Sequence, residues 1–250
     1  MNLSPYQYKL NSQGRLPRLL EKEFNLKLYI ANKNYSSWSL RPWALLQARG
    51  IEFEEVLVPF AAGSQPSAFK AFSPTSKVPC LEDNGLLIWD SLAICEYVAE
   101  QHPGCWPIDT TARAWARSAA AEMHSGFQTL RSLCPMNCGI RVALEKIDDG
   151  LRADVERIDT LWLEGLAKFG GPYLAGKEYG IIDAFFAPVI FRVQSYGLQL
   201  GQQAQSYVER MLSLPSMQHW YAEALLETWR KPEYEQAAAA HGQIVRDFRV

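Results

Sequence analysis

The stretch LKLYIANKNYSSWSLRPWALLQARGIEFEEVLVPF, residues 26–60, decides the fold of the first part of the chain. Apolar Leu26, Leu28 and Ile30 occupy every second position, and this period of two predicts a strand. The elements that follow are a loop with candidate helix caps over 32–39, a helix over 40–50 and a second strand over 51–60. The stretch therefore predicts strand, loop, helix and strand in direct succession.

The pattern continues to residue 103 with a short helix, a hairpin and a final helix. The short helix is predicted around residues 67–72, and Asn84-Gly85 forms the turn of the hairpin. DSLAICEYVAEQHP, residues 90–103, predicts a helix that stops at His102-Pro103. The order βαβαββα implies a mixed four-stranded sheet whose first half is a right-handed βαβ unit, so we expect an α/β thioredoxin-like domain over 25–103.

The remainder of the chain has the apolar spacing of helices. We interpret residues 104–111, which are rich in Pro and Gly, as a linker, and residues 112–250 as an all-α domain. Its predicted helices form a five-helix bundle over 111–132, 142–170, 180–197, 205–214 and 215–230. The polar residues 1–24 are interpreted as an N-terminal extension, partly disordered.

Two details of the helical part carry separate expectations. CPMNCG, residues 134–139, is expected to interrupt a long helix, with a kink at Pro135. At the start of the helix over 180–197, Gly180 occupies the capping position and Asp183 is expected to accept from the free N–H groups of the first turn.

Composition narrows the class of function. The 250 residues carry 25 Lys and Arg against 27 Asp and Glu, so no strong positive field exists to hold a nucleic acid. Five cysteines without a Cys-x-x-Cys motif predict free thiols in the cytoplasm, and four scattered histidines predict no metal site. No apolar run is long enough to span a bilayer, so no membrane partner is expected.

Three stretches resemble the soluble glutathione transferases, and among them the serine-type bacterial and zeta-like members. They are SSWSLR at 36–41, KVPCLED at 77–83 and DSLAICEYVAE at 90–100. The resemblance implies a transferase that binds reduced glutathione as co-substrate, stabilises its thiolate and transfers it to a small hydrophobic electrophile. It also implies a role in detoxification and a homodimer in which the first domain of one chain meets the second domain of the other.

The start of the helix at Ser36 and Ser37 is the candidate catalytic site. A thiol becomes a nucleophile at neutral pH when its thiolate is stabilised, and a helix N-terminus with a serine hydroxyl supplies donors for that. The resemblance implies Ser36 as the activating residue, although the zeta motif has cysteine where this chain has Trp38. Ser37 and Tyr29 remain rival activators, and simple helix capping by both serines is the structural alternative.

Lys77, Val78, Pro79, Asp90 and Ser91 are the candidate glutathione-binding residues. The resemblance implies a cis Pro79, with the backbone of Val78 pairing with the cysteinyl part of glutathione; a trans proline that opens a strand is the alternative. Asp90-Ser91 opens a helix, where Ser91 can bind the α-carboxylate of the ligand and Asp90 its α-amino group. An ordinary N-cap is the alternative for this pair.

Weaker candidates remain. Arg41 is a further candidate for ligand contact, or else part of an ion pair at its helix. His124, Phe127 and Met136 are candidates to line the electrophile pocket, but residues of this kind at helical spacing more often belong to a core.

Two other functions are compatible with the fold. A non-catalytic binding or interaction module would need no glutathione, and a glutathione-dependent isomerase or peroxidase would use the same site for another reaction. A thiol-disulfide exchanger would need a cysteine at the first helix start, and residues 35–39 contain none.

Overall fold

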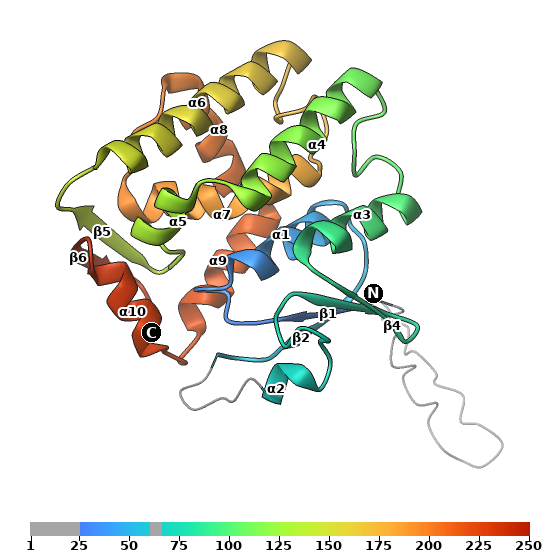
Figure 1. Cartoon of the computed structure of the whole chain (residues 1–250), viewed down its shortest axis with the longest axis horizontal. Coiled ribbons are helices and arrows are strands. Elements are labelled where there is room, and N and C mark those ends of the chain that lie inside the picture. The colour runs from blue at the N-terminus through green and yellow to red at the C-terminus, as the bar shows by residue number, and fades with distance from the viewer. Residues whose placement is uncertain (1–25, 61–66) are drawn as a thin grey trace, which may run out of the picture.

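A computed structural model describes residues 26–60 and 67–250, which form a sheet-based domain followed by a mainly helical one (Figure 1). The extension predicted over 1–24 lies outside the described residues. The first domain has the predicted βαβαββα order of elements. Its elements are β1 (Leu26–Ile30), α1 (Ser37–Ala48), β2 (Glu54–Leu57), α2 (Ser67–Lys70), β3 (Cys80–Asp83), β4 (Leu86–Trp89) and α3 (Ser91–Gln101).

The sheet has the mixed topology that the sequence predicts, with strand order β2-β1-β3-β4. β1 pairs in parallel with β2, and β3 pairs in antiparallel fashion with both β1 and β4. Leu28 and Ile30 are fully buried, as are Leu40 and Trp43 of α1, because the alternating positions of a strand present one apolar face to a covering helix. This packing fixes the start of α1 at one end of the sheet, beside the start of α3 (Figure 1).

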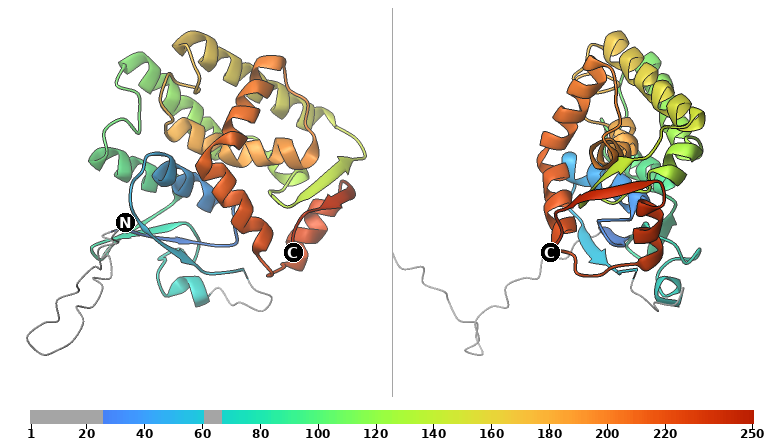
Figure 2. Two further views of the ribbon diagram at one scale, coloured as in Figure 1. Left: turned by 180° about the vertical axis from the view of Figure 1, so that it is seen from behind. Right: turned by 90° about the vertical axis from the view of Figure 1, so that its left-hand side faces the viewer.

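The second domain is built around α7, which is buried along almost its whole length. Figures 1 and 2 show the other helices of this domain arranged around it. The elements are α4 (Thr110–Ser125), α5 (Gln128–Leu133), β5 (Ile140–Leu144), α6 (Asp149–Phe169), α7 (Ile181–Tyr196), α8 (Gln202–Ser213), α9 (Pro215–Leu226), α10 (Pro232–Ala239) and β6 (Gly242–Asp247). The helical class of this domain is confirmed, but the expectation of five helices is wrong: residues 111–132 are divided between α4 and α5, where Phe127 has a left-handed backbone, and α10 follows the last predicted helix. The domain also has one addition that is not helical.

That addition is an antiparallel pair of strands, β5 with β6. The expectation that a helix begins at residue 142 is therefore wrong, because residues 140–144 form β5. Ile140 and Val142 are buried and alternate with more exposed neighbours, which is a strand period. The expectation of a kinked helix at 134–139 is also wrong, because α5 ends at Leu133 and these residues form a connection to β5. Helix α6 begins only after Asp148, whose side chain accepts from the N–H of Leu151.

The expected cap of α7 is confirmed. The Asp183 carboxylate accepts from the N–H of Gly180 at 3.0 Å and from the N–H of Leu174 at 3.0 Å. It also accepts from the Tyr207 hydroxyl at 2.8 Å. Burial raises the pKa of this carboxyl to about 6, while these donors act to lower it. Asp183 therefore serves folding by fixing the start of the central helix.

Candidate active site

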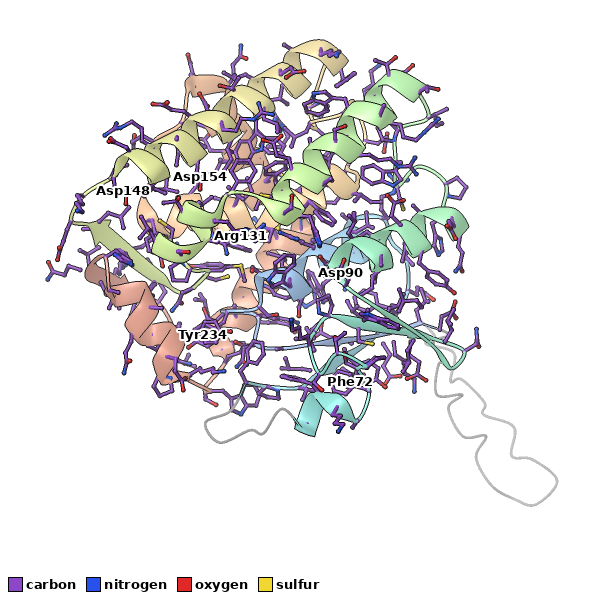
Figure 3. All side chains as sticks on the ribbon, in the orientation of Figure 1. Phe72, Asp90, Arg131, Asp148, Asp154 and Tyr234 are labelled. Atoms are coloured by element: carbon purple, nitrogen blue, oxygen red, sulfur yellow. The ribbon has the colours of Figure 1, made fainter. Side chains whose placement is uncertain are left out.

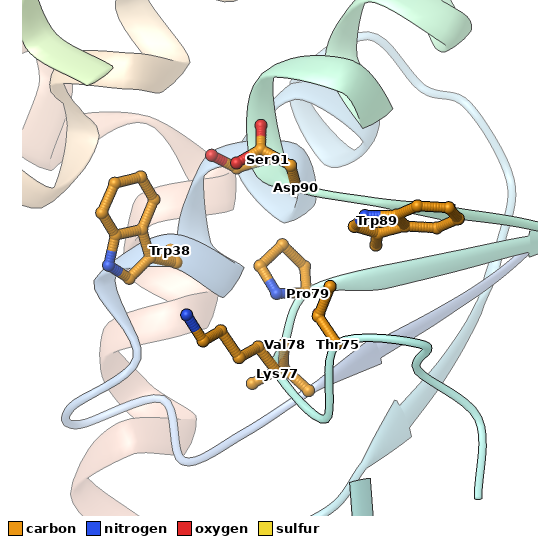
Figure 4. A pocket seen from close by; sticks show the side chains of 8 residues that line it. All are labelled: Trp38, Thr75, Lys77, Val78, Pro79, Trp89, Asp90 and Ser91. Carbon is orange, nitrogen blue, oxygen red and sulfur yellow. The ribbon is translucent and has the colours of Figure 1, made fainter. Parts of the chain in front are cut away.

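A cavity of ≈ 490 Å³ lies where the start of α1, the start of α3 and the segment before β3 meet (Figure 4). Its lining residues come from these three segments and the end of β4. They are Trp38, Thr75, Lys77, Val78, Pro79, Trp89, Asp90 and Ser91. The cavity therefore contains all five residues that the sequence proposes for binding, although they come from two separate stretches of the chain.

The segment Lys77–Pro79 forms one wall of the cavity. The Val78–Pro79 peptide bond is cis. Neither the N–H nor the C=O of Val78 is hydrogen-bonded to another described residue. This backbone can therefore pair with an extended ligand as a strand edge does.

Asp90 and Ser91 form the opposite wall, at the N-terminus of α3. Asp90 is the N-cap, and its Oδ1 accepts from the N–H of Leu92 at 2.8 Å and of Ala93 at 3.4 Å, so the capping alternative is correct for this oxygen. Its Oδ2 lies 3.5 Å from Nε2 of His124. The backbone of Asp90 has φ +73°, a conformation that costs about 1–3 kcal/mol in a non-glycine residue and is concentrated at functional sites.

Ser36 and Ser37 lie at the start of α1 but do not line the cavity. Ser36 is the N-cap residue of this helix, and its Oγ lies 2.7 Å from Oγ of Ser39, which in turn accepts from the N–H of Ala31. The Ser37 hydroxyl has no hydrogen bond to any described residue. Both serines are buried, whereas Trp38, the residue that follows them, lines the cavity.

Tyr29, the third candidate activator, is engaged elsewhere. Its hydroxyl donates to Oε2 of Glu82 at 2.8 Å, and its ring stacks on Phe72 at 4.3 Å. Burial and the hydrogen bond to Glu82 raise the pKa of Tyr29 to about 12. A phenol committed to a carboxylate in this way is a poor donor to a thiolate.

Sequence reasoning missed three residues that line the cavity, namely Trp38, Thr75 and Trp89. Trp38 is 38% exposed and Trp89 is 45% exposed, which is unusual for so large an apolar side chain. Trp38 follows Ser37 in the sequence and Trp89 precedes Asp90. This position next to a candidate site residue is the signal by which both tryptophans could have been found. Phe127 and Met136 are buried core residues, as the alternative for them predicts.

Arg41 and His124 are the two remaining candidates from the sequence. Arg41 forms no ion pair within the described part of the chain, so the ion-pair alternative for it is wrong. Its Nη1 lies 3.4 Å from Oγ of Ser91 and 3.4 Å from Nδ1 of His124. His124 therefore lies immediately behind the cavity wall, between Arg41 and Asp90.

The five thiols are free and buried, and none lies at the cavity. Burial raises the pKa of Cys80 to about 11 and that of Cys134 to about 12. Thiols with such pKa values are not thiolates at neutral pH, so they are not nucleophiles there. Any thiolate chemistry at this cavity must come from a bound ligand.

Two further features concern the described residues 26–60 and 67–250. No three His, Cys, Asp or Glu side chains gather there in the way that metal ligands do. No helix there has both the length and the hydropathy that crossing a bilayer requires.

Comparison with known proteins identifies the family. Residues 35–101 match the family described as "Glutathione S-transferase, N-terminal domain". Glutathione S-transferase Z1 of Arabidopsis thaliana is 32% identical over 176 residues, which cover 67% of this chain and 77% of that protein. A protein named "Probable maleylacetoacetate isomerase" in Caenorhabditis elegans is 29% identical over 184 residues, covering 70% of this chain and 81% of the other.

Solved structures agree on the fold. A glutathione transferase homologue from Burkholderia, solved with bound glutathione, gives a TM-score of 0.61 at 23% identity and covers 80% of this chain and 97% of its own. Glutathione S-transferase unclassified 2 from Bombyx mori gives a TM-score of 0.65 at 19% identity, covering 88% and 99% of the two chains. With the sequence matches, these place the chain in the glutathione S-transferase family.

Proposed function

We propose that this protein is a glutathione transferase that binds reduced glutathione in the cavity between the starts of α1 and α3. The observation that carries the proposal is the composition of that cavity. It combines a helix N-terminus with a serine, an acidic side chain and an unpaired backbone segment, which are complementary to the carboxylate, ammonium and peptide groups of glutathione.

Each group of the ligand has a candidate partner. The α-carboxylate binds the hydroxyl and the backbone N–H of Ser91 at the start of α3, where the helix dipole favours an anion. The α-amino group binds Oδ2 of Asp90, which is half-exposed and not used for capping. Lys77 lines the same cavity, and the backbone of Val78 pairs with the cysteinyl residue.

Ser36 is the candidate activator of the thiol. The Ser36 hydroxyl donates to Oγ of Ser39 at 2.7 Å, and because a hydroxyl hydrogen rotates, the same proton can turn to the ligand's sulfur. A donor at the start of α1 stabilises the thiolate, and the thiol proton is released to solvent. The sulfur then forms a bond to the electrophilic carbon, and the leaving group departs with the electron pair of the bond that breaks.

Proximity supplies much of the rate in such a reaction. Holding the thiolate and the electrophile together replaces a bimolecular encounter by a reaction within one complex. The exposed faces of Trp38 and Trp89 offer apolar surface beside the cavity, which suits a small hydrophobic electrophile. Conjugation of such compounds is a detoxification reaction.

A glutathione-dependent isomerase is the second candidate, favoured by the relative named as a probable maleylacetoacetate isomerase. The same bound thiolate would add to the substrate and leave again after rotation about a bond. Trp38 weighs against this reaction, because the zeta motif has a small cysteine at that position and the indole occupies the cavity wall here.

The experiment that tests the proposal is a calorimetric titration with reduced glutathione, followed by the pH dependence of thiolate ultraviolet absorbance in the complex. We expect binding, with the pKa of the bound thiol well below that of free glutathione. Absence of binding would overturn the proposal in favour of a non-catalytic interaction module. Binding without a lowered thiol pKa would contradict the assigned activation.

Location and assembly complete the proposal. Five free cysteines suit the reducing cytoplasm.

The edge strand β4 exposes Leu86 and Trp89, an apolar surface that suits a homodimer contact. Sedimentation of the purified protein at micromolar concentration should give twice the chain mass, and a monomer under these conditions would contradict the dimer.

A further inference from the structure

Arg249, which follows β6, is buried among side chains of both domains. Its side chain is 4% exposed, whereas its neighbours Phe248 and Val250 are exposed. β6 pairs with β5 and lies beside α10 (Figures 1 and 2). A buried charge is stable only when it is paired and hydrogen-bonded, so the partners of this guanidinium group indicate what it does.

These partners are two carboxylates and one phenol. Nη1 and Nη2 of Arg249 donate to the two carboxylate oxygens of Glu235 at 2.6 Å and 2.9 Å. Nε and Nη2 donate to those of Asp247 at 2.9 Å and 2.7 Å. Nη1 also lies 3.4 Å from the Tyr35 hydroxyl, which itself donates to Glu235. The planar guanidinium group therefore fixes the orientation of the Glu235 carboxylate, and Glu235 holds Tyr35.

Gly139 makes room for the arginine side chain. A Cβ atom on Gly139 would overlap Cγ and Cδ of Arg249, so a larger residue would displace the arginine. The C=O of Gly139 accepts from the N–H of Phe248 at 2.9 Å, and its N–H donates to Oδ1 of Asn34 at 3.0 Å. Gly139 thus joins the segment that carries Arg249 to the loop that precedes Ser36.

Tyr35 connects this cluster to the start of α1. Its ring stacks on that of Tyr234 at 5.3 Å, and Figure 3 labels Tyr234 beside α10, on the side toward the first domain. The C=O of Tyr35 accepts from the N–H of Ser37 at 2.9 Å, and Ser36 lies between them in the chain. The side chain of Tyr35 is therefore anchored in the second domain, while its backbone contacts the first turn of the helix with the two serines.

Separate contacts hold the earlier part of the same loop. Lys33 and Asn34 donate their N–H groups to Glu227 at 2.6 Å and 3.1 Å. These bonds do not involve Arg249, so the loop keeps an attachment to the second domain when Arg249 is replaced. The specific effect of Arg249 is on Tyr35, the last residue before the serines.

We propose that Arg249 is a positioning residue for thiol activation. It orients Glu235, Glu235 holds the Tyr35 hydroxyl, and Tyr35 sets the place of the Ser36 hydroxyl relative to the ligand's sulfur. The inference rests on the proposed function and adds to it a residue that touches neither the ligand nor the sulfur. Groups that act on a reacting atom must be held to within about 0.5 Å, so a small displacement of Tyr35 is enough to weaken activation.

The test measures the pKa of the bound glutathione thiol by ultraviolet absorbance and the affinity for glutathione by calorimetry. Arg249→Gln removes the charge and the planar fork, whereas Arg249→Lys keeps the charge and loses the fork. Tyr35→Phe removes only the hydroxyl that donates to Glu235. The control is Arg246→Gln, which replaces an exposed arginine of β6 whose guanidinium lies over the Phe248 ring at 4.4 Å.

We expect Arg249→Gln to raise the thiol pKa by about one pH unit, because the serine hydroxyl no longer meets the sulfur in the right geometry. Affinity should stay within about twofold of the wild type, since no residue that lines the cavity is among the partners of Arg249. Arg249→Lys should give a smaller shift in the thiol pKa. Arg246→Gln should change neither quantity.

Tyr35→Phe should raise the thiol pKa in the same direction as Arg249→Gln. The double variant should shift it little more than either single variant, because both residues act through one chain of contacts. Additive shifts would contradict that chain, and a shift of equal size in Arg246→Gln would contradict the assignment to Arg249.

A loss of stability without a change in thiol pKa would overturn the inference. Arg249→Gln would then unfold at lower urea concentration while the bound thiol titrates as in the wild type, and Arg249 would be a purely structural residue. If Arg249→Gln does not fold, Tyr35→Phe decides by the same criterion, because it keeps the ion pair between Arg249 and Glu235. A wild-type protein that does not bind glutathione, or binds it without a lowered thiol pKa, would overturn the proposed function itself.

Discussion

The two sides of the candidate site are held in different ways. The serine loop, residues 32–37 before and at the start of α1, is buried throughout. The ligand wall, residues 75–79 with 89–91, is largely exposed or half-exposed, and it lies within the first domain. The region proposed to activate the thiol is therefore embedded between domains, while the region proposed to bind the ligand is open.

The contacts of the serine loop come mainly from the second domain. The two carboxylate oxygens of Glu227 accept from the N–H groups of Lys33, at 2.6 Å, and Asn34, at 3.1 Å. Nε1 of Trp220 donates to the C=O of Lys33 at 2.9 Å. The Asn34 side chain donates to the C=O of Ala224 and accepts from Gly139. The last part of the chain thus fixes the backbone that leads to Ser36.

The end of the chain adds a second attachment through Tyr35. The Tyr35 hydroxyl donates to Glu235, and Arg249 forms ion pairs with Glu235 at 2.6 Å and with Asp247 at 2.7 Å. The ligand wall has fewer such contacts: Lys77 donates its N–H to nearby Ser73 and Asp90 caps its own helix, while Oδ2 of Asp90 lies 3.5 Å from Nε2 of His124 on α4. We therefore expect thiol activation to depend on both domains and glutathione affinity mainly on the first.

The largest expected effect follows from removing Glu227. In Glu227→Leu the buried N–H groups of Lys33 and Asn34 lose their acceptor, and each unsatisfied group costs about 1–3 kcal/mol. We expect the free energy of unfolding, measured in urea, to fall by about 2–5 kcal/mol. Glu227→Gln retains one acceptor and should lose less. A change below about 0.5 kcal/mol in the leucine variant would show that the loop is not held by this contact.

In the ligand wall the main expected effect is on affinity. Ser91→Ala removes one hydroxyl donor to the α-carboxylate, and we expect glutathione to bind more weakly by about 1.5–3 kcal/mol in calorimetry. Ser118→Ala, an exposed serine on α4, is the matched control. Unaltered affinity in Ser91→Ala would remove this residue from the site.

The third prediction separates the candidate activators at the thiol. Ser36→Ala should raise the pKa of the bound glutathione thiol by about one to two pH units and leave affinity nearly intact, because it removes a hydrogen bond to the charged sulfur. Tyr29→Phe should leave the thiol pKa unchanged, since Tyr29 is engaged with Glu82. If Ser37→Ala shifts the thiol pKa and Ser36→Ala does not, the role belongs to Ser37.

The smallest expected effect concerns His124, which lies between Arg41 and Asp90. Burial lowers the pKa of His124 from 6.5, more than the field of Asp90 raises it. As pH falls below 6.5, the unfolded chain binds this proton before the folded one, so stability decreases with falling pH in that window. His124→Gln should flatten the pH dependence of urea unfolding just below pH 6.5. An equal slope in the variant and the wild type would assign the dependence to other groups.

Local sequence patterns were sufficient for the fold of the first domain. The alternation at Leu26, Leu28 and Ile30 and the Asn84-Gly85 turn act through neighbours in the chain, so their outcome could be read from the sequence. They failed at residues 140–144, because a short apolar run suits either helix or strand, and its partner β6 begins about 100 residues later. The strand was decided by pairing, which the sequence does not display.

The sequence by itself determined the thioredoxin-like domain, the helical second domain and a set of candidate residues at two helix starts. Only the tertiary structure decided that Lys77, Val78, Pro79, Asp90 and Ser91 share one cavity with Trp38. It alone also brought Arg41 beside Ser91 and His124. The physical reason is that helix and strand periods arise from neighbouring residues, whereas a cavity and its field arise from groups that meet only when distant elements pack.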